Sequence, residues 1–268
     1  MSEVVHITRR PPVVEIVMDR PPVNAVDQSL ADGLYRAFRA FQDDDALRVA
    51  LLTGAGTRCF SAGWDLKAAA AALDAGTDTV GLAMTPGGFA GITEFWDLDK
   101  PVVAALNGPA IGGGFEIALS CDVLLAAEQV YFALPEMQRG FLPDAGAVQN
   151  LPRKVPYNVA MEMLLTGRRV PAAEARQWGL VHEVLPAERL LDAARALADR
   201  IAEGAPLALR ALKAVMRASD GLTLRESFAL TKPGKSGLPI YEQMMTSEDF
   251  AEGPRAFAEK RNPVWKGR

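Results

Sequence analysis

The chain has 268 residues, with 29 basic and 33 acidic side chains, a formal net charge of −4 and a pI near 5.4. This length can bury a sizeable core, and the charge balance gives no overall field that would attract nucleic acid or an anionic membrane. The N-terminus lacks the features of a signal peptide, and no apolar run reaches the roughly 18 residues of a membrane span, so we expect a cytoplasmic protein.

The two cysteines, Cys59 and Cys121, form neither a metal-ligand cluster nor a disulfide framework, and we expect both to be small buried residues. His6 and His182 lie in strand-like runs and are interpreted as structural. We therefore expect no metal site and no Ser-His-Asp arrangement.

The first part of the chain alternates strand and helix signals. Residues 13–18 are a short β-rich run, residues 29–42 have apolar residues at helical spacing, and residues 49–53 predict a second strand. Gly54 and Gly56 follow that strand, but no third glycine stands three residues further on. The dinucleotide-binding fingerprint therefore fails.

Residues 60–67 (Phe-Ser-Ala-Gly-Trp-Asp-Leu-Lys) read as a strand, a small-residue turn and the start of a helix. The alternative is that Ser-Ala-Gly is only a turn. Residues 74–91 are rich in Gly and Thr, and we expect a mobile segment beside the site. Residues 89–96 look helical.

The most informative stretch is residues 107–119, Asn-Gly-Pro-Ala-Ile-Gly-Gly-Gly-Phe-Glu-Ile-Ala-Leu, after the apolar run 102–106. Three glycines at a helix start are unfavourable, which indicates that a ligand approaches the backbone closely. A free helix-initiating amide near Gly113 could donate to an oxygen that gains negative charge, and a matching turn at residues 60–67 could supply a second donor. Glu116 shares a helix face with Gly113. The alternative is close helix packing with a solvated Glu116.

A second glutamate follows two more β-like runs, at residues 122–126 and 130–134. Glu136 comes directly after a strand and a proline, at an edge where side chains face solvent or a cleft. Taken alone, it would be interpreted as a surface carboxylate. A turn at residues 142–146 then leads into a helical region.

From Pro186 onward the pattern predicts helices alone, at residues 187–201, 206–219, 222–231, 239–245 and 252–261. We therefore divide the chain into a core at residues 1–185, which carries the active site, and a helical region at residues 186–268. Helices of this kind need a second surface for their apolar stripes, and association between subunits is one way to provide it.

The two glycine-bearing turns, together with Phe-Ala-Leu-Pro-Glu at residues 132–136, resemble the enoyl-CoA hydratase (crotonase) superfamily over essentially the whole chain. Residues 61–70, 87–94, 166–169 and 247–268 resemble its carnitinyl-CoA dehydratase (crotonobetainyl-CoA hydratase) branch. The resemblance implies an α/β spiral of β-β-α repeats with a C-terminal helical trimerisation region. It also implies an acyl-CoA substrate, a homotrimer or a hexamer of two trimers, and no cofactor, because coenzyme A is part of the substrate.

The resemblance also assigns residues by motif position. Trp64 and Gly113 match the backbone donors of the oxyanion hole, and Glu116 and Glu136 match the catalytic carboxylates of true hydratases. The joint presence of the two glutamates favours hydration or dehydration over decarboxylation, dehalogenation or isomerisation. Looser matches place coenzyme A contacts, the last two from a neighbouring subunit, at Ala62, Lys67, Phe257 and Lys260.

Two departures concern substrate and tail. Many simple hydratases have Pro-Gly-Ala-Gly-Gly where this chain has Pro-Asp-Ala-Gly-Ala at residues 143–147, and residues 232–239 differ from the carnitinyl relatives. Trp64 and Asp144 are candidates for recognising a trimethylammonium acyl group. Equally, the indole could pack as core and Asp144 could cap the helix that begins near Ala145.

These features favour an enoyl-CoA hydratase or dehydratase, with a carnitine-type acyl group as one candidate. A general short-chain enoyl-CoA hydratase is the alternative within enzymes. A non-catalytic member that binds coenzyme A or RNA is the alternative from another class, and the two glutamates and the acidic pI speak against it.

Overall fold

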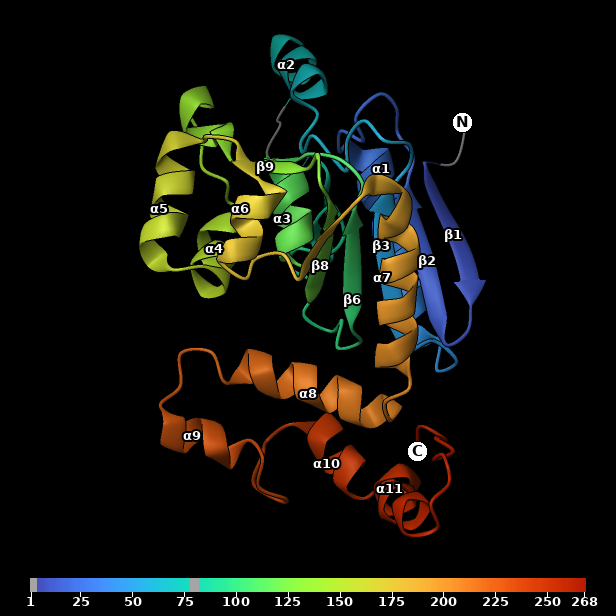
Figure 1. The fold of residues 1–268 in the computed structure, drawn as a ribbon. Helices are drawn as coiled ribbons and strands as arrows, with labels where there is room; N and C mark the ends of the chain where they lie inside the picture. Colours follow the sequence, from blue (N-terminus) through green and yellow to red (C-terminus); the bar gives the residue numbers. More distant parts are fainter. Residues whose placement is uncertain (1–3, 78–81) are drawn as a thin grey trace.

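The computed structural model describes residues 4–77 and 82–268. Its largest layer is a six-stranded sheet with the order β1-β2-β3-β6-β8-β11 (Figure 1). The edge strand β1 is antiparallel to β2, and the other neighbouring pairs are parallel. The bounds are β1 (Val5–Arg10), β2 (Val13–Met18), β3 (Val49–Gly54), β6 (Val102–Leu106), β8 (Val123–Ala127) and β11 (Glu183–Leu185).

The central strands are buried on both faces. Every residue of β3 and β6 is buried, because α7 (Ala187–Ala202) packs against both strands. α1 (Gln28–Asp43) packs on β1 and β2. Parallel strands covered on both faces consist of continuous apolar runs, which is why residues 13–18 and 49–53 were recognised as strands. β1 was recognised only as a strand-like run around His6, because five of its six residues are exposed and it has no continuous apolar run.

A second, smaller sheet carries the turns that lead to the site. Its order is β10-β9-β7, from β10 (Val170–Pro171), β9 (Tyr131–Ala133) and β7 (Ala110–Ile111). Isolated bridges from Val26 to Trp64 and from Ser61 to Ala110 extend it.

Each repeat runs from a long strand through a short strand or bridge into helical structure. β3 leads to α2 (Leu66–Asp74), and β6 leads through β7 to α3 (Gly113–Leu119). β8 leads through β9 to the 3₁₀ helix η1 (Pro135–Arg139) and then to α4 (Ala147–Lys154). The predicted α/β spiral of β-β-α repeats is confirmed. α5 (Tyr157–Thr166) and α6 (Ala172–Gln177) complete this body.

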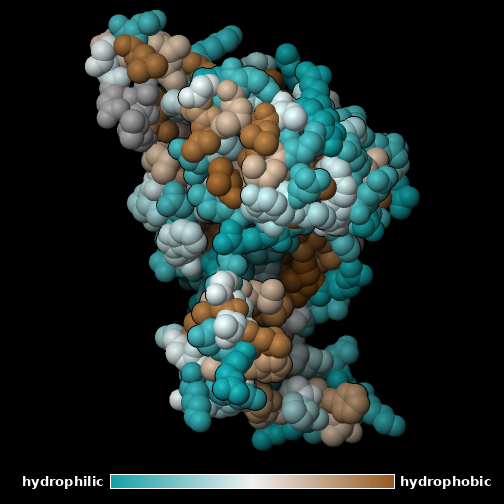
Figure 2. Space-filling model, turned by 90° about the vertical axis from the view of Figure 1, so that its left-hand side faces the viewer, coloured by the Kyte–Doolittle hydropathy of each residue, from teal (hydrophilic) through white to brown (hydrophobic). Residues whose placement is uncertain are grey.

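The remaining helices lie below the sheet in Figure 1: α8 (Pro206–Ala218), α9 (Leu224–Ala229), α10 (Pro239–Met245) and α11 (Glu248–Ala258). Lys213 of α8, almost fully buried, ties them to the body through Asp122 (Nζ to Oδ2, 2.7 Å). Figure 2 shows these helices as a separate lobe with apolar surface. Leu212 and Met216 of α8 and Phe228 of α9 are well exposed. The boundary at residue 185 and the role in trimerisation stay predictions.

One predicted helix is wrong. Residues 89–96 contain the end of a short hairpin, β4 (Met84–Thr85) with β5 (Gly88–Phe89), followed by turns. The apolar spacing fits a helix, but Ala90 and Gly91 have φ values of 53° and 71°, which no right-handed helix accommodates. The mobility predicted for residues 74–91 falls in part on residues 78–81, which lie outside the described residues.

No helix in the part of the chain that the structure describes is both long and apolar enough to cross a bilayer.

Candidate active site

The glycines that open α3 are required by close contacts. Gly112 has φ 55° and ψ −129°, and its N–H donates to the carbonyl of Ala133 (2.9 Å). A Cβ added at Gly112 would lie 2.5 Å from Glu136 Oε1, and one at Gly114 would lie 2.1 Å from the carbonyl oxygen of Ser61. Both positions therefore exclude a side chain, and the turn sits directly against Glu136.

Two backbone amides are free to bind an oxygen. The N–H of Gly113 opens α3, and it donates to no other described residue. Val26 forms hydrogen bonds with both chain neighbours of Trp64. Its N–H donates to the Gly63 carbonyl (2.7 Å), and its carbonyl accepts from the Asp65 N–H (3.0 Å). The Trp64 N–H is thereby left without a partner among the described residues.

The two turns that carry these amides touch each other. A Cβ added at Gly63 would lie 2.5 Å from the Gly113 nitrogen. Only the Gly113 donor starts a helix, since α2 begins after its cap residue Asp65 and Trp64 precedes the cap. The expectation of two helix-initiating amides is wrong in this detail, because the second amide belongs to the turn itself.

Glu116 and Glu136 are both buried, with 3% and 5% of their surface exposed. Glu116 Oε1 accepts a hydrogen bond from the Ala147 N–H (3.0 Å) at the start of α4. Glu136 stands on η1, and its Oε2 is buried with no hydrogen-bond partner among the described residues. A buried carboxylate oxygen left open in this way can receive a proton or a ligand.

Burial dominates the proton affinity of both carboxyls. It raises the pKa of Glu116 to about 8; the Ala147 N–H opposes this, and the charges of Glu136 and Asp144 add to it. Burial also raises the pKa of Glu136, opposed by its own backbone N–H and by Arg139. Neighbouring buried carboxyls resist ionising together, so near neutral pH we expect the pair to share a proton.

These groups line one cavity of about 550 Å³. Its polar side is formed by Trp64 and Gly113 with their amides and by the two glutamates. Its apolar wall includes Leu66, Met84, Phe89, Ile111, Phe141 and Leu142. Among the described residues, no group of three or more His, Cys, Asp or Glu side chains is placed to hold a metal ion.

The sequence matches known proteins over its whole length. The profile of the enoyl-CoA hydratase/isomerase family matches residues 8–268. The chain belongs to this family. Carnitinyl-CoA dehydratases of Proteus mirabilis (strain HI4320) and Salmonella agona (strain SL483) are each 49% identical to it over 268 residues, which covers all of this chain and all of each relative.

Solved structures of the family agree with the fold. The enoyl-CoA hydratase from Mycobacterium tuberculosis H37Rv has a TM-score of 0.88 and 37% identity, with all of both chains covered. The enoyl-CoA hydratase from Bacillus anthracis has a TM-score of 0.85 and 32% identity, covering 99% of this chain and 100% of that chain. The predicted family and the predicted fold class are confirmed.

Against this family background, the structure brings most of the predicted site residues together. The same cavity is lined by Ala62, Trp64, Gly113, Glu116, Glu136 and Asp144. Lys67 is exposed in the first turn of α2. Phe257, 88% exposed, and Lys260 lie at the end of α11, far from α2 in Figure 1. Their roles, like those of the cavity residues, stay predictions, and no residue of α11 lines the cavity.

The structure contradicts the helix-cap reading of Asp144, whereas Trp64 packs against the hydrophobic core, as its alternative reading expects. Asp144 does not cap a helix, because α4 begins at Ala147 with Gly146 as its cap and no side-chain cap bond. The Trp64 ring is half-buried and meets the Phe141 ring edge-on, with centroids 6.2 Å apart. Both side chains border the cavity, as an acyl-pocket role requires.

Sequence reasoning missed two charged residues of the cavity, Glu94 and Arg139. Glu94 ends the string at residues 87–94, and a Cβ at Gly88 would lie 2.7 Å from Glu94 Cβ, so the hairpin aims this residue. Arg139 stands three residues after Glu136 on η1. That spacing on one helical turn was the available signal.

Proposed function

We propose that this chain is an enoyl-CoA hydratase or dehydratase, a hydro-lyase that adds water to, or removes it from, the α,β double bond of an acyl-CoA thioester. The observation that carries the proposal is the meeting, in one cavity, of two backbone amides that have no partner among the described residues, at Trp64 and Gly113, and two buried carboxyls, at Glu116 and Glu136.

The amides are placed to act on the thioester oxygen. Attack at the β-carbon moves electrons onto that oxygen and creates an enolate-like charge. Donors fixed by the Gly112 turn and the Val26 bridge favour this charge over the neutral ground state, and so lower the barrier.

The carboxyls complete the proton balance. The ionised member of the pair takes a proton from water as the water oxygen bonds to the β-carbon. The protonated member gives its proton to the α-carbon, so the pair exchanges protonation states in one turnover. Dehydration runs the same steps backward. No further cofactor enters this chemistry, because coenzyme A belongs to the substrate.

The charge of the cavity supports a cationic acyl group of the carnitine type. Beyond the catalytic pair, the described residues that line the cavity include two carboxylates, Glu94 and Asp144, and one cation, Arg139. Trp64 and Phe141 offer aromatic surface, which attracts quaternary ammonium groups. The carnitinyl-CoA dehydratase names of the 49% identical relatives agree with this choice. A general short-chain enoyl-CoA hydratase is the second candidate, favoured by the neighbouring enoyl-CoA hydratase structures.

Assembly and location are part of the proposal. The exposed apolar residues of α8 and α9 would be covered in a trimer or a hexamer, and a neighbouring subunit would then bring Phe257 and Lys260 to the nucleotide of coenzyme A. The cytoplasm is the proposed compartment, where an acyl-CoA substrate would be available.

The direct test mixes the purified protein with crotonyl-CoA, and separately with crotonobetainyl-CoA, and follows the enone absorbance. We expect a decrease on both substrates at a rate proportional to enzyme concentration. A folded, assembled protein that consumes neither would overturn the proposal.

A further inference from the structure

The two catalytic carboxyls are held in different ways. Glu116 is fixed through its side chain by the Ala147 N–H. The Glu136 side chain accepts no hydrogen bond from another described residue, and its Oε1 rests against the Cα of Gly112. The position of Glu136 therefore depends on the backbone of η1. η1 is a 3₁₀ helix of only five residues, so we expect its position to depend on the elements that pack against it.

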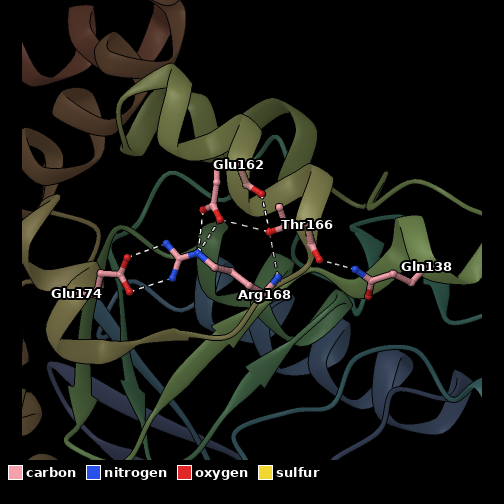
Figure 3. Close-up of polar contacts among 5 residues, drawn as sticks. All are labelled: Gln138, Glu162, Thr166, Arg168 and Glu174. Atoms are coloured by element: carbon pink, nitrogen blue, oxygen red, sulfur yellow. Dashed lines mark hydrogen bonds and ion pairs between the residues drawn. The ribbon is translucent and has the colours of Figure 1, made fainter.

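The end of α5 lies directly on η1. Gly167 caps α5 with φ 60°, and a Cβ there would lie 2.8 Å from Gln138 Nε2 and 2.9 Å from both the Leu134 carbonyl oxygen and Pro135 Cα. Gln138 Nε2 also donates to the carbonyl of Thr166 (Figure 3). Residues 166–167 thus contact the backbone just before Glu136 and the Gln138 side chain just after it.

Arg168 anchors residues 166–167 by forming ion pairs with two helices. Its Nε donates to both carboxylate oxygens of Glu162 on α5 (2.7 and 2.9 Å). Its Nη1 and Nη2 donate to the two oxygens of Glu174 on α6 (3.0 and 2.6 Å). Figure 3 shows the guanidinium between the two carboxylates, with Thr166 and Gln138 continuing the contact toward η1. The two-bond fork to Glu174 fixes geometry as well as charge, and the Nε–H shared by the two Glu162 oxygens adds a second ion pair.

The residues after Arg168 also contact the strand that precedes η1. Val170 of β10 pairs with Phe132 of β9, the strand that leads into η1. We propose that Arg168 is a positioning residue for Glu136: its ion pairs with Glu162 and Glu174 fix residues 166–170, and these fix the backbone that directs the Glu136 carboxyl toward Gly112 and the cavity. The consequence for turnover rests on the function proposed above.

The test replaces Arg168 by Gln, which removes the ion pairs with both Glu162 and Glu174. We expect kcat to fall about tenfold or more with KM within about twofold, because the loss is one of catalytic alignment. Glu174→Gln removes one fork and should give a smaller loss of the same kind, which keeps the test available if Arg168→Gln folds poorly. The matched control is Arg195→Gln, which loses a two-bond pair with Glu15 (2.8 and 2.9 Å) away from η1 and should leave kcat unchanged.

A double-mutant cycle separates positioning from general stability. If Arg168 acts through Glu136, then adding Arg168→Gln to Glu136→Gln should cause no further loss of kcat. A loss of the same size in both backgrounds would overturn the proposal, as would an unchanged kcat in Arg168→Gln.

Hydrogen exchange gives a readout that does not depend on activity. Backbone amides of residues 136–141 should exchange about tenfold faster in Arg168→Gln than in the natural protein, and not in Arg195→Gln. Unchanged exchange would reject the positioning role even if the protein hydrates no enoyl-CoA. Failure of the proposed function is seen separately, as absence of turnover in the natural protein.

Discussion

Glu136 Oε1 lies only 2.5 Å from the position that a Cβ on Gly112 would take, too close for any side chain there. Gly112 also has a backbone conformation, φ 55° and ψ −129°, that is essentially restricted to glycine. The glycine and the carboxyl therefore form one unit: the turn that presents the Gly113 amide also sets how closely Glu136 approaches it.

Gly112→Ala should displace Glu136 and lower kcat by roughly 10²-fold, the scale for a misplaced catalytic group. The matched control is Gly179→Ala, which has φ 79° but nothing within 4 Å of its Cβ position. Both variants carry backbone strain of about 1–3 kcal/mol and should melt at lower temperature. Only Gly112→Ala should lose turnover per folded molecule. Equal kcat values in the two variants would show that the contact with Glu136 is unimportant.

Burial of Glu116 predicts a pH-dependent stability. With its pKa raised from 4.5 to about 8, folded Glu116 keeps a proton that the unfolded chain releases. Between these values the free energy of unfolding therefore falls as pH rises, by up to about 1.4 kcal/mol per pH unit. Glu116→Gln removes this cost, so its melting temperature relative to the natural protein should rise between pH 5 and pH 8. A difference that does not vary with pH would mean that the Glu116 pKa is not raised.

The carboxylates outside the catalytic pair should select the acyl group. Asp144→Asn and Glu94→Gln should each lower kcat/KM for crotonobetainyl-CoA about fivefold, since both carboxylates are exposed and one attraction at the surface is worth on the order of 1 kcal/mol. Crotonyl-CoA, which lacks the cation, serves as the control and should be affected little. Equal losses on both substrates would assign these residues to the fold or to the chemistry.

Assembly can be tested on the exposed face of α8. Leu212→Glu combined with Met216→Glu places two charges on side chains that are 62% and 66% exposed. Light scattering should give a trimer or hexamer mass for the natural protein and a smaller mass for this variant. Leu73→Glu on α2, at 62% exposure, should keep the natural mass. A monomer mass for the natural protein at micromolar concentration would contradict the proposed assembly.

The features that were predicted correctly from the sequence are those formed by residues close together in the chain. Gly113 and Glu116 share one helical turn, and β3 is an uninterrupted apolar run, so spacing alone was informative. The helix predicted at residues 89–96 failed because apolar spacing does not report the positive φ of Ala90.

Contacts between segments that are distant in the sequence could not be predicted from local residue patterns. Gln138 contacts Thr166, and Arg168 joins α5 to α6, in the region where β9 and β10 pair. Nothing in the local pattern of residues 166–169 predicts what they support. The same holds for Glu94, which reaches the cavity through the hairpin of β4 and β5.

The central claim is that two buried carboxyls share the proton transfers of hydration, and the most direct measurement is the kcat of Glu116→Gln and of Glu136→Gln on an enoyl-CoA. Each substitution keeps size and burial and removes the proton-transfer group. We predict that kcat falls by roughly 10²-fold or more in each variant, while affinity for a non-reacting acyl-CoA stays near that of the natural protein. Near-normal turnover in either variant would contradict the two-carboxyl mechanism.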